Sequence, residues 1–524
     1  MFSYVTRTKS VRWLALSVIV LSSGAVCAQQ NDPIVDAIVK EGTQHSQLEQ
    51  YAFELMDVIG PRLVGTPQMK QAHDWVVQQY LNMGIKAHNE EYGEWRAWQR
   101  GTTQVEMTVP RLKSLEATQL AWSPATKEKG VEAEVVVLPV VANAAEFQKW
   151  LPHAKGKIVL ISMHQPTGRS EEQWKEYATV ASLQKMQELK KNQTQEWNQR
   201  IQNTGYDIKT LPKALEDAGA VGIVSSFWTG IMGANRIFEA FTTAVPTLDM
   251  AMEDYGTLYR LAEKGYKPQI KIKALSKNLG KTKTYNTIAT IKGTEKPDEY
   301  VVLSAHLDSW DGGTGATDNG TGIIVMMEAA RILKAVLPDN KRTILIGNWG
   351  SEEQGLNGSR AFVEDHPELH DKIQVVFNQD NGTGRIVNLS GQGFLHAYDY
   401  LGNWLQAVPE DYKRDLKTTF PGSPSSGGSD HVSFVSADIP AFMLGALSWG
   451  YGNYTWHTNR DTYDKIVFDE VRNNAILIAI LAYKASQEDA LVSRQKINLP
   501  KSSDGKTIEW PAQKSPKRTG GLIN

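Results

Sequence analysis

The sequence contains very little cysteine and no excess of charge of either sign. Cys27 is the only cysteine among 524 residues, and it lies in a segment typical of export signals. A mature chain without cysteine has no disulfide, no thiol nucleophile and no thiolate metal ligand. Lys and Arg number 56 against 58 Asp and Glu, and no basic block stands out. The composition therefore excludes the electrostatic footprint of a nucleic-acid-binding protein.

Long hydrophobic runs are also missing. Beyond the N-terminus no apolar run reaches the roughly 20 residues needed to cross a bilayer, so we expect no integral membrane domain. At the N-terminus, basic residues precede the apolar run 13–21, and Ala28 ends a stretch suited to cleavage. Residues 1–28 are predicted to be a signal peptide, and the protein to be secreted or periplasmic. A membrane anchor would need a longer span, and lipidation of Cys27 would need a smaller residue than Val26 before it.

The length of the chain and the changes of residue pattern along it predict several domains. The chain is 41% hydrophobic and 22% charged, which is average for soluble globular proteins, and 524 residues can form more than one core. Residues 29–112 begin with helical spacing and form the N-terminal part of the main domain. Residues 113–283 change to short β-type runs, with a helical insertion over 171–202 that is crowded with Gln, Lys and Glu. The tail 491–524, rich in Lys, Ser and Pro, is expected to be extended and poorly packed.

Strands and helices alternate regularly over 284–490. Strands are predicted at 300–305, 342–349, 373–378 and 439–444, with helices at 320–336, 358–364 and 470–484. This alternation is typical of an α/β fold with a mixed, mainly parallel sheet sandwiched by helices. Because ligands bind at the carboxyl ends of parallel strands, the residues that follow each strand are the candidates for chemistry.

Histidines and carboxylates follow these strand ends. They are His306, Asp308, Asp318, Glu352, Glu353, Asp380 and His457. Carboxylates placed side by side repel one another and take up protons unless cations share the site. Nitrogen and oxygen ligands without sulfur suit Zn²⁺, and two ions about 3.5–4 Å apart need a bridging carboxylate. The set therefore predicts two Zn²⁺ ions per chain, although each motif alone would be read as a turn or a structural residue.

Each residue can be given a role in such a site. Asp318, on a turn flanked by glycines, is the predicted bridge. His306 and Asp380 are assigned to one ion, and Glu353 and His457 to the other. The order of the residues along the chain does not decide which histidine shares an ion with which acid.

Two further carboxylates have predicted catalytic roles. Asp308, two residues after His306, can accept the ring N–H that the metal does not use and so set the tautomer. Glu352 can accept a proton from the attacking water and pass it to a leaving amine. Metal ions of this kind lower the pKa of water and polarise a carbonyl, so the predicted reaction is hydrolysis of an amide.

These motifs together resemble the co-catalytic zinc exopeptidases of metallopeptidase family 28. The segments that carry the resemblance are His306-Leu307-Asp308-Ser309, Gly315-Ala316-Thr317-Asp318-Asn319-Gly320-Thr321-Gly322, Glu352-Glu353-Gln354-Gly355 and His457-Thr458-Asn459-Arg460-Asp461-Thr462. The resemblance implies a zinc exopeptidase fold, two zinc ions, and Glu352 as general base. It also implies a cis peptide between the bridging Asp318 and Asn319.

The resemblance extends over nearly the whole mature chain to the plasma glutamate carboxypeptidase (carboxypeptidase Q) branch. Members of this branch act as dipeptidases or aminopeptidases. The segments 215–223 and 245–248 resemble the protease-associated domain that the branch carries as an insertion, which implies a β-rich domain of this kind over 113–283.

One departure from the family concerns the oxyanion. Many relatives place a tyrosine in the loop equivalent to 420–431, whereas this stretch is here mainly Ser and Gly. His431 and Tyr454 are the candidate substrate or oxyanion residues, with a structural role for His431 as the alternative. The aromatic loop 449–456 is expected either to line the substrate pocket or to pack on the inserted domain.

The sequence thus predicts an exported di-zinc exopeptidase, of aminopeptidase or dipeptidase type, that acts on short peptides. Carboxypeptidase-type activity on the same site and a single-zinc enzyme similar to glutaminyl cyclases remain alternatives, and a homodimer is left open. Zinc amidohydrolases with a lid domain are disfavoured. Their extra domain lies between the late acidic ligand and the last histidine, whereas the large insertion here precedes His306.

Overall fold

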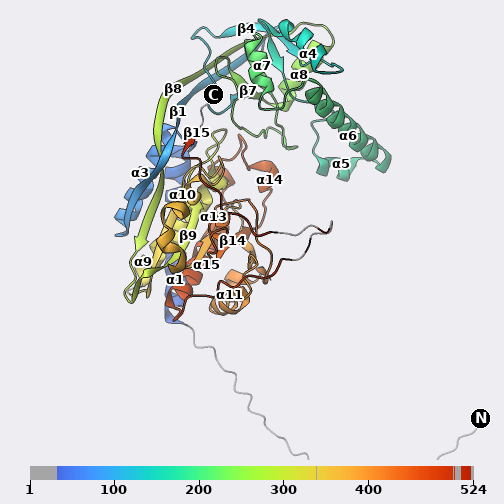
Figure 1. Cartoon of the computed structure of the whole chain (residues 1–524). Helices are drawn as coiled ribbons and strands as arrows, with labels where there is room; N and C mark the ends of the chain where they lie inside the picture. The colour runs from blue at the N-terminus through green and yellow to red at the C-terminus, as the bar shows by residue number, and fades with distance from the viewer. Residues whose placement is uncertain (1–31, 338, 500, 502–504, 506–508, 521–524) are drawn as a thin grey trace, which may run out of the picture.

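The computed structural model describes residues 32–337, 339–499, 501, 505 and 509–520. The predicted signal peptide, 1–28, lies outside these residues. Within the described ranges, no helix is long and apolar enough to span a membrane. Figure 1 shows two parts joined by a pair of long strands, residues 86–109 and 269–291: an upper part formed by residues 110–268, and a lower part formed by the other described residues.

The N-terminal segment of the lower part is helical. Its elements are α1 (Pro33–Gln44), α2 (Leu48–Ala52), η1 (Phe53–Ile59) and α3 (Pro67–Asn82). Asp32 caps α1 by accepting the Ile34 N–H at 3.0 Å, and Thr66 caps α3 by accepting the Met69 N–H at 3.2 Å. Both helices begin with proline, which needs no intrahelical hydrogen bond at that position.

Two long antiparallel strands connect the parts. They are β1 (Lys86–Val109) and β8 (Gln269–Ile291). A strand rises roughly 3.3 Å per residue, so the 24 residues of β1 are long enough to run from the lower part into the upper part. At one end β8 pairs with a strand of the upper part, and at the other with a strand of the lower part, so one sheet runs through both.

The upper part carries its own hydrophobic cores. Its elements are β2 (Lys113–Leu115), β3 (Ala117–Gln119), β4 (Val131–Val137), α4 (Ala144–Trp150), η2 (Leu151–Ala154), β5 (Ile158–Leu160), α5 (Glu171–Tyr177), α6 (Val180–Asn203), α7 (Leu211–Asp217), β6 (Gly222–Ser225), β7 (Thr247–Met250) and α8 (Met252–Glu263). The strand order from β8 is β4-β5-β6-β7-β3. Helices α5 and α6 confirm the predicted solvated helical insertion, because neither buries a residue.

The lower part contains the predicted alternation of strands and helices. Its elements are β9 (Lys296–His306), η3 (Ala316–Gly320), α9 (Thr321–Val336), β10 (Arg342–Trp349), α10 (Asn357–Asp365), η4 (Pro367–Lys372), β11 (Ile373–Asn378), β12 (Ile386–Ser390), α11 (Ala397–Gln406), α12 (Glu410–Lys413), β13 (Lys417–Thr419), α13 (His431–Val435), β14 (Ala441–Ala446), α14 (Tyr451–Tyr454), η5 (Tyr463–Lys465), α15 (Phe468–Gln487) and β15 (Thr519–Gly520). Strands β14, β11, β9 and β10 are parallel neighbours. Strand β8 is antiparallel to β10, and β12 is antiparallel to β14 but parallel to β13. The mixed, mainly parallel sheet with helices packed on it is confirmed.

The C-terminal segment differs from the sequence prediction. The Trp510 ring lies 5.9 Å from the Phe394 ring, and Arg518 forms ion pairs with Glu364 at 2.9 Å and Asp365 at 2.7 Å. Strand β15 pairs with β1 in parallel. The prediction of poor packing is wrong for these residues, because a few aromatic and arginine side chains supply contacts that the average composition of the tail conceals.

Candidate functional site

The predicted ligand residues gather at the carboxyl ends of adjacent parallel strands. Strand β9 ends at His306, and the loop after it brings Asp318 to η3. Glu353 follows β10, Asp380 follows β11, and His457 follows α14. Because β10, β9, β11 and β14 are neighbours in the sheet, these segments meet at one edge.

Two groups of potential ligands share one aspartate. His306 Nε2 lies 3.3 Å from Asp380 Oδ1 and 3.5 Å from Asp318 Oδ1. His457 Nε2 lies 2.9 Å from Glu353 Oε2 and 3.2 Å from Asp318 Oδ2. In each group the ligand atoms are within 4.8 Å of one another. Asp318 therefore turns one oxygen toward each group.

The chemistry of these groups fits divalent metal ions. The buried Oε1 of Glu353 and Nδ1 of His457 have no hydrogen-bond partner among the described residues. Several buried carboxylates in contact need positive charge to offset their repulsion and desolvation. A donor set of carboxylate oxygens and imidazole nitrogens without sulfur suits Zn²⁺.

The electrostatics of the clusters point the same way. Burial disfavours a charged His457, but Glu353 and Asp318 outweigh it and raise its pKa to about 10. For His306 the opposing charges of Asp380 and Glu352 likewise overcome burial and raise the pKa well above its usual range. Protons thus supply the positive charge that a metal ion would replace, so binding of an ion would release protons.

Asp308 links two of the strand ends. His306 Nδ1 donates to the backbone carbonyl of Asp308 at 3.0 Å, whereas the nearer carboxylate oxygen is 3.5 Å away. The carboxylate instead accepts the backbone N–H groups of Glu352 at 3.0 Å and Glu353 at 3.2 Å. Asp308 therefore orients the histidine mainly through its main chain and holds the Glu352-Glu353 turn with its side chain.

Glu352 lies beside the clusters without belonging to either. Burial raises its pKa well above the usual range, with the His306 charge opposing and the charges of Asp380 and Asp430 adding to the effect. A carboxyl group with a raised pKa can both accept and return a proton near neutral pH. From the sequence, Asp430 was given a structural role beside His431, as an anchor of the Gly-rich loop. Its carboxylate is buried, and burial raises its pKa to about 7.

Asp461, which was given no role from the sequence, positions the shared aspartate. Its two carboxylate oxygens accept the backbone N–H groups of Thr317 at 2.8 Å and Asp318 at 3.0 Å. Asp461 lies in the segment 457–462, which was one of those that carry the family resemblance, so the motif could have indicated it. The expected cis peptide between Asp318 and Asn319 is present.

The candidate oxyanion residues fall in different surroundings. Burial lowers the pKa of His431 to about 4, and neither of its ring nitrogens has a partner among the described residues. The Tyr454 side chain is largely exposed on a pocket of about 410 Å³. Tyr451, one turn earlier, lines the same pocket, and burial together with the charges of Asp318 and Asp380 raises the pKa of its hydroxyl well above the usual range. Tyr451 is therefore electrostatically close to the clusters.

A loop of the upper part forms one wall of the site. The Ile237 N–H donates to the His457 carbonyl at 2.8 Å. The rings of Phe238 and Trp310 lie 5.4 Å and 6.1 Å from the imidazole of His457. Part of the aromatic loop 449–456 contacts this wall, so the upper part contributes directly to the surroundings of a candidate ligand.

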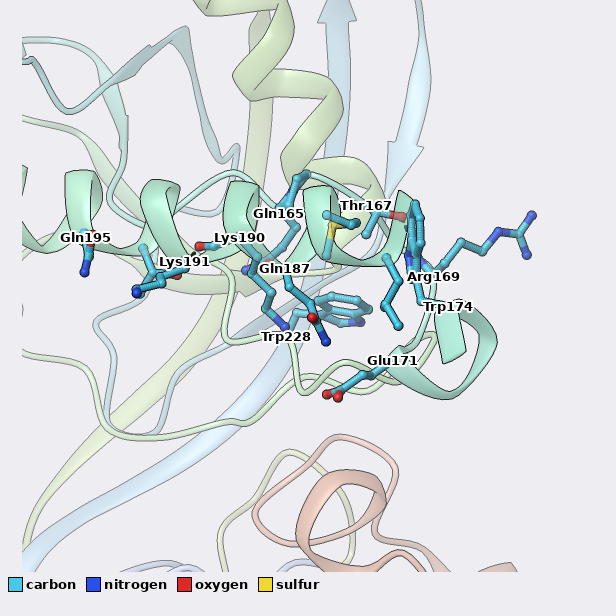
Figure 2. Close-up of a pocket in the computed structure, with 14 residues that line it drawn as sticks. Gln165, Thr167, Arg169, Glu171, Trp174, Gln187, Lys190, Lys191, Gln195 and Trp228 are labelled. Atoms are coloured by element: carbon cyan, nitrogen blue, oxygen red, sulfur yellow. Dashed lines mark hydrogen bonds between the residues drawn. The ribbon is translucent and has the colours of Figure 1, made fainter. Parts of the chain in front are cut away.

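A second pocket, of about 390 Å³, lies in the upper part between α5, α6 and the loop 165–169 (Figure 2). Trp174 and Trp228 project into it, and Lys190 and Glu171 lie at its edge. None of the predicted ligand residues lines this pocket, so it is separate from the metal-ligand clusters.

The fold and the paired clusters define the class of zinc peptidases. The model of peptidase family M28 matches residues 286–482, which contain all the predicted ligand residues and Glu352. Members of this family are metallo-exopeptidases, which are hydrolases.

Similar proteins span most of the chain. Carboxypeptidase Q of Rattus norvegicus is 29% identical over 448 residues, covering 84% of this chain and 85% of the relative. Carboxypeptidase Q of Xenopus laevis is 28% identical over 473 residues, covering 88% and 90%. A peptidase M28 precursor from Shewanella amazonensis aligns with a TM-score of 0.64 and 24% identity over 88% of this chain and 98% of its own. BSAP, a zinc aminopeptidase from Bacillus subtilis, aligns with a TM-score of 0.53 and 19% identity over 88% and 98%. The two structural likenesses show the fold.

Proposed function

We propose that this protein is an exported di-zinc exopeptidase that hydrolyses short peptides, of aminopeptidase or dipeptidase type. The observation that carries the proposal is the pair of ligand groups sharing Asp318, with the buried Glu352 beside them. A shared carboxylate between two groups favours two ions over the single zinc of a glutaminyl-cyclase-like enzyme.

The ligands divide between the two ions. His306 and Asp380 would hold one Zn²⁺, Glu353 and His457 the other, and Asp318 would bind both. When bound, such ions lower the pKa of water and polarise the scissile carbonyl.

The remaining residues move protons and orient groups. The Glu352 carboxylate accepts a proton from the attacking water and donates it to the nitrogen of the leaving amine. Asp308 and Asp461 keep the turns that carry the ligands in place through backbone N–H groups. Tyr451 is the better-supported oxyanion donor, because it lines a pocket together with Thr317, the residue before the shared Asp318. The described contacts give His431 no partner in either ligand group, and we do not assign it this role.

Two further parts of the proposal are the end of the peptide at which the enzyme acts and its export. Relatives carry the name carboxypeptidase Q, while BSAP is named a zinc aminopeptidase, so carboxypeptidase-type activity is retained as the alternative. Export rests on the predicted signal peptide 1–28. The protease-associated character of 113–283 and the homodimer stay predictions.

The test is a panel of matched free and N-acetylated peptides, assayed before and after chelation, with metal analysis of the purified protein. We expect about two zinc ions per chain, hydrolysis of peptides with a free N-terminus, and at least a 100-fold loss of activity on chelation that added zinc reverses. Cleavage of the N-acetylated peptides would contradict the aminopeptidase and dipeptidase assignment. Activity unaffected by chelation would contradict the metal mechanism.

A further inference from the structure

Arg236 lies on the loop of the upper part that contacts the candidate metal site. Its Nη2 donates to the backbone carbonyl of Gly452 at 2.9 Å, and its guanidinium carbon is 5.0 Å from the centroid of the Trp456 ring. The other neighbour of that indole is the imidazole of His457, stacked on it with centroids 3.9 Å apart and planes at 27°. The guanidinium therefore reaches the indole that packs on a candidate zinc ligand.

The charge of Arg236 has no acidic partner. Among the described residues no carboxylate lies within ion-pair distance of it, and its buried Nε has no acceptor. Burial lowers its pKa, and no neighbouring carboxylate offsets that effect. A partly buried guanidinium without a counter-ion is destabilising unless an anion completes its surroundings.

Other arginines nearby are paired, which makes Arg236 distinctive. Arg460 lies three residues after His457 in the sequence. Its Nη2 is 2.7 Å from Glu116, and its Nε donates to the Gly233 carbonyl at 2.6 Å. Arg100 pairs with Asp311 at 2.6 Å. Of these three arginines, Arg236 is the one without a carboxylate partner among the described residues.

The position of Arg236 is set by its neighbour in sequence. The Asn235 side chain donates to Asp249 at 2.6 Å and to the Met250 carbonyl at 2.9 Å. Its backbone N–H donates to the Asn459 side chain at 2.9 Å. The loop is therefore tied both to β7 and to the segment that carries His457, so the guanidinium is held at a defined place.

We propose that Arg236 binds a carboxylate of the peptide substrate, and that this contact selects short peptides with a free carboxylate close to the scissile bond. The proposal rests on the function proposed above. A guanidinium matches a carboxylate through two parallel N–H donors. The Trp456 indole separates the Arg236 guanidinium from the candidate zinc ligand His457. Because an extended residue spans about 3.5 Å, the first or second residue after the scissile bond can reach the guanidinium. The carboxylate can be the C-terminal one or that of an acidic side chain.

The kinetic test compares Leu-Ala, Leu-Ala-amide and Leu-Glu-amide on the zinc-loaded full chain. We expect R236Q to lower kcat/KM for Leu-Ala by about tenfold or more, mainly through KM, while Leu-Ala-amide changes less than about twofold. R460Q is the matched control: it removes a guanidinium that already has a carboxylate partner, and it should keep the wild-type ratio of acid to amide. If Arg236 instead binds the carboxylate of an acidic side chain, R236Q would lower kcat/KM for Leu-Glu-amide and leave that for Leu-Ala unchanged.

A binding measurement separates this proposal from the proposed reaction. Calorimetry on the zinc-loaded E352Q variant should show binding of uncleaved Leu-Ala, and the E352Q/R236Q double variant should weaken it by about tenfold. If R236Q lowered kcat/KM equally for Leu-Ala and both amides, the proposal would be overturned, because Arg236 would then only support Trp456. A wild-type enzyme that cleaved Leu-Ala and Leu-Ala-amide equally well would overturn it too. If E352Q binds Leu-Ala through Arg236 but the wild type cleaves no peptide, the reaction is wrong and the carboxylate site stands.

Discussion

The buried guanidinium of Arg62 donates from Nε to the backbone carbonyl of Leu307 at 2.7 Å, directly after the candidate ligand His306. Its Nη1 and Nη2 donate at 2.7 Å to the carbonyls of Thr314 and Gly315, which precede the shared aspartate. Burial lowers the pKa of Arg62 to about 10, and nearby carboxylates oppose that effect, so it remains a cation. One side chain from the N-terminal segment therefore joins both ends of the loop between two candidate ligands.

Replacing Arg62 with Met should destabilise the protein by about 3 kcal/mol, because four backbone carbonyls, those of Gly60, Leu307, Thr314 and Gly315, lose a donor at once. Urea unfolding of the metal-loaded protein measures the change. R62K keeps the charge but not the planar fork of donors, so it should recover only part of the loss. An unchanged unfolding midpoint for R62M would show that other contacts hold this loop.

The adjacent glutamates 352 and 353 should separate chemistry from metal binding. E352Q is expected to lower kcat by about 10²–10⁴-fold and to keep its zinc, because the amide cannot accept the proton. E353Q should lose zinc, because Glu353 belongs to a ligand group. Kinetics and metal analysis of both variants provide the test, and a fully active E352Q would contradict the role given to Glu352.

Stability should depend on pH through Asp249 in the upper part. Burial raises the pKa of this carboxyl group to about 7 from 3.8, even though Asn235, Phe227 and Ser225 donate hydrogen bonds to it. Between these values the unfolded chain releases the proton and the folded chain keeps it. The contribution of Asp249 to stability therefore falls as pH rises from about 4 to about 7.

The variant D249N should remove this contribution. Its thermal midpoint is expected to fall less than that of the wild type between pH 4 and pH 7, by at least about 2 °C. D411N is the control, because the Asp411 side chain is 82% exposed. Parallel curves for the wild type and D249N would show that Asp249 does not titrate in this range.

The packed tail leads to a prediction about Trp510. Removing its ring by W510A exposes part of the Phe394 surface, and we expect a loss of about 1–2 kcal/mol. Thermal unfolding should show a midpoint lower by roughly 2–5 °C. Y177A removes a ring that is 76% exposed and should leave the midpoint unchanged. If both variants melted like the wild type, the tail would contribute nothing to stability.

Local patterns predicted the lower part well because its strands are buried on both faces and bounded by turns. The predicted strands 342–349 and 373–378 coincide with β10 and β11. Candidate ligands could be found because parallel topology brings successive strand ends to one edge, so their positions follow from element order alone. The domain limits 29–112, 113–283 and 284–490 remain predictions.

Contacts between distant segments could not be read in the same way. Nothing local distinguishes Tyr451 from Tyr454, yet Tyr454 is 43% exposed, whereas burial and the charge of Asp318 raise the pKa of the Tyr451 hydroxyl. Asp308 was expected to meet His306 through its carboxylate, but the main chain makes the closer contact. The three long-range hydrogen bonds of Arg62 depend on how the N-terminal segment packs.

By itself, the sequence determined the kind of sheet and the set of acids and histidines at its edge, because hydrophobic periodicity and residue type act over short distances along the chain. Only the tertiary structure decided which atoms face one another, that a loop of the upper part lies against the site, and that Arg236 has no carboxylate partner among the residues the structure describes. Those features depend on packing between segments far apart in the chain, which no local pattern encodes.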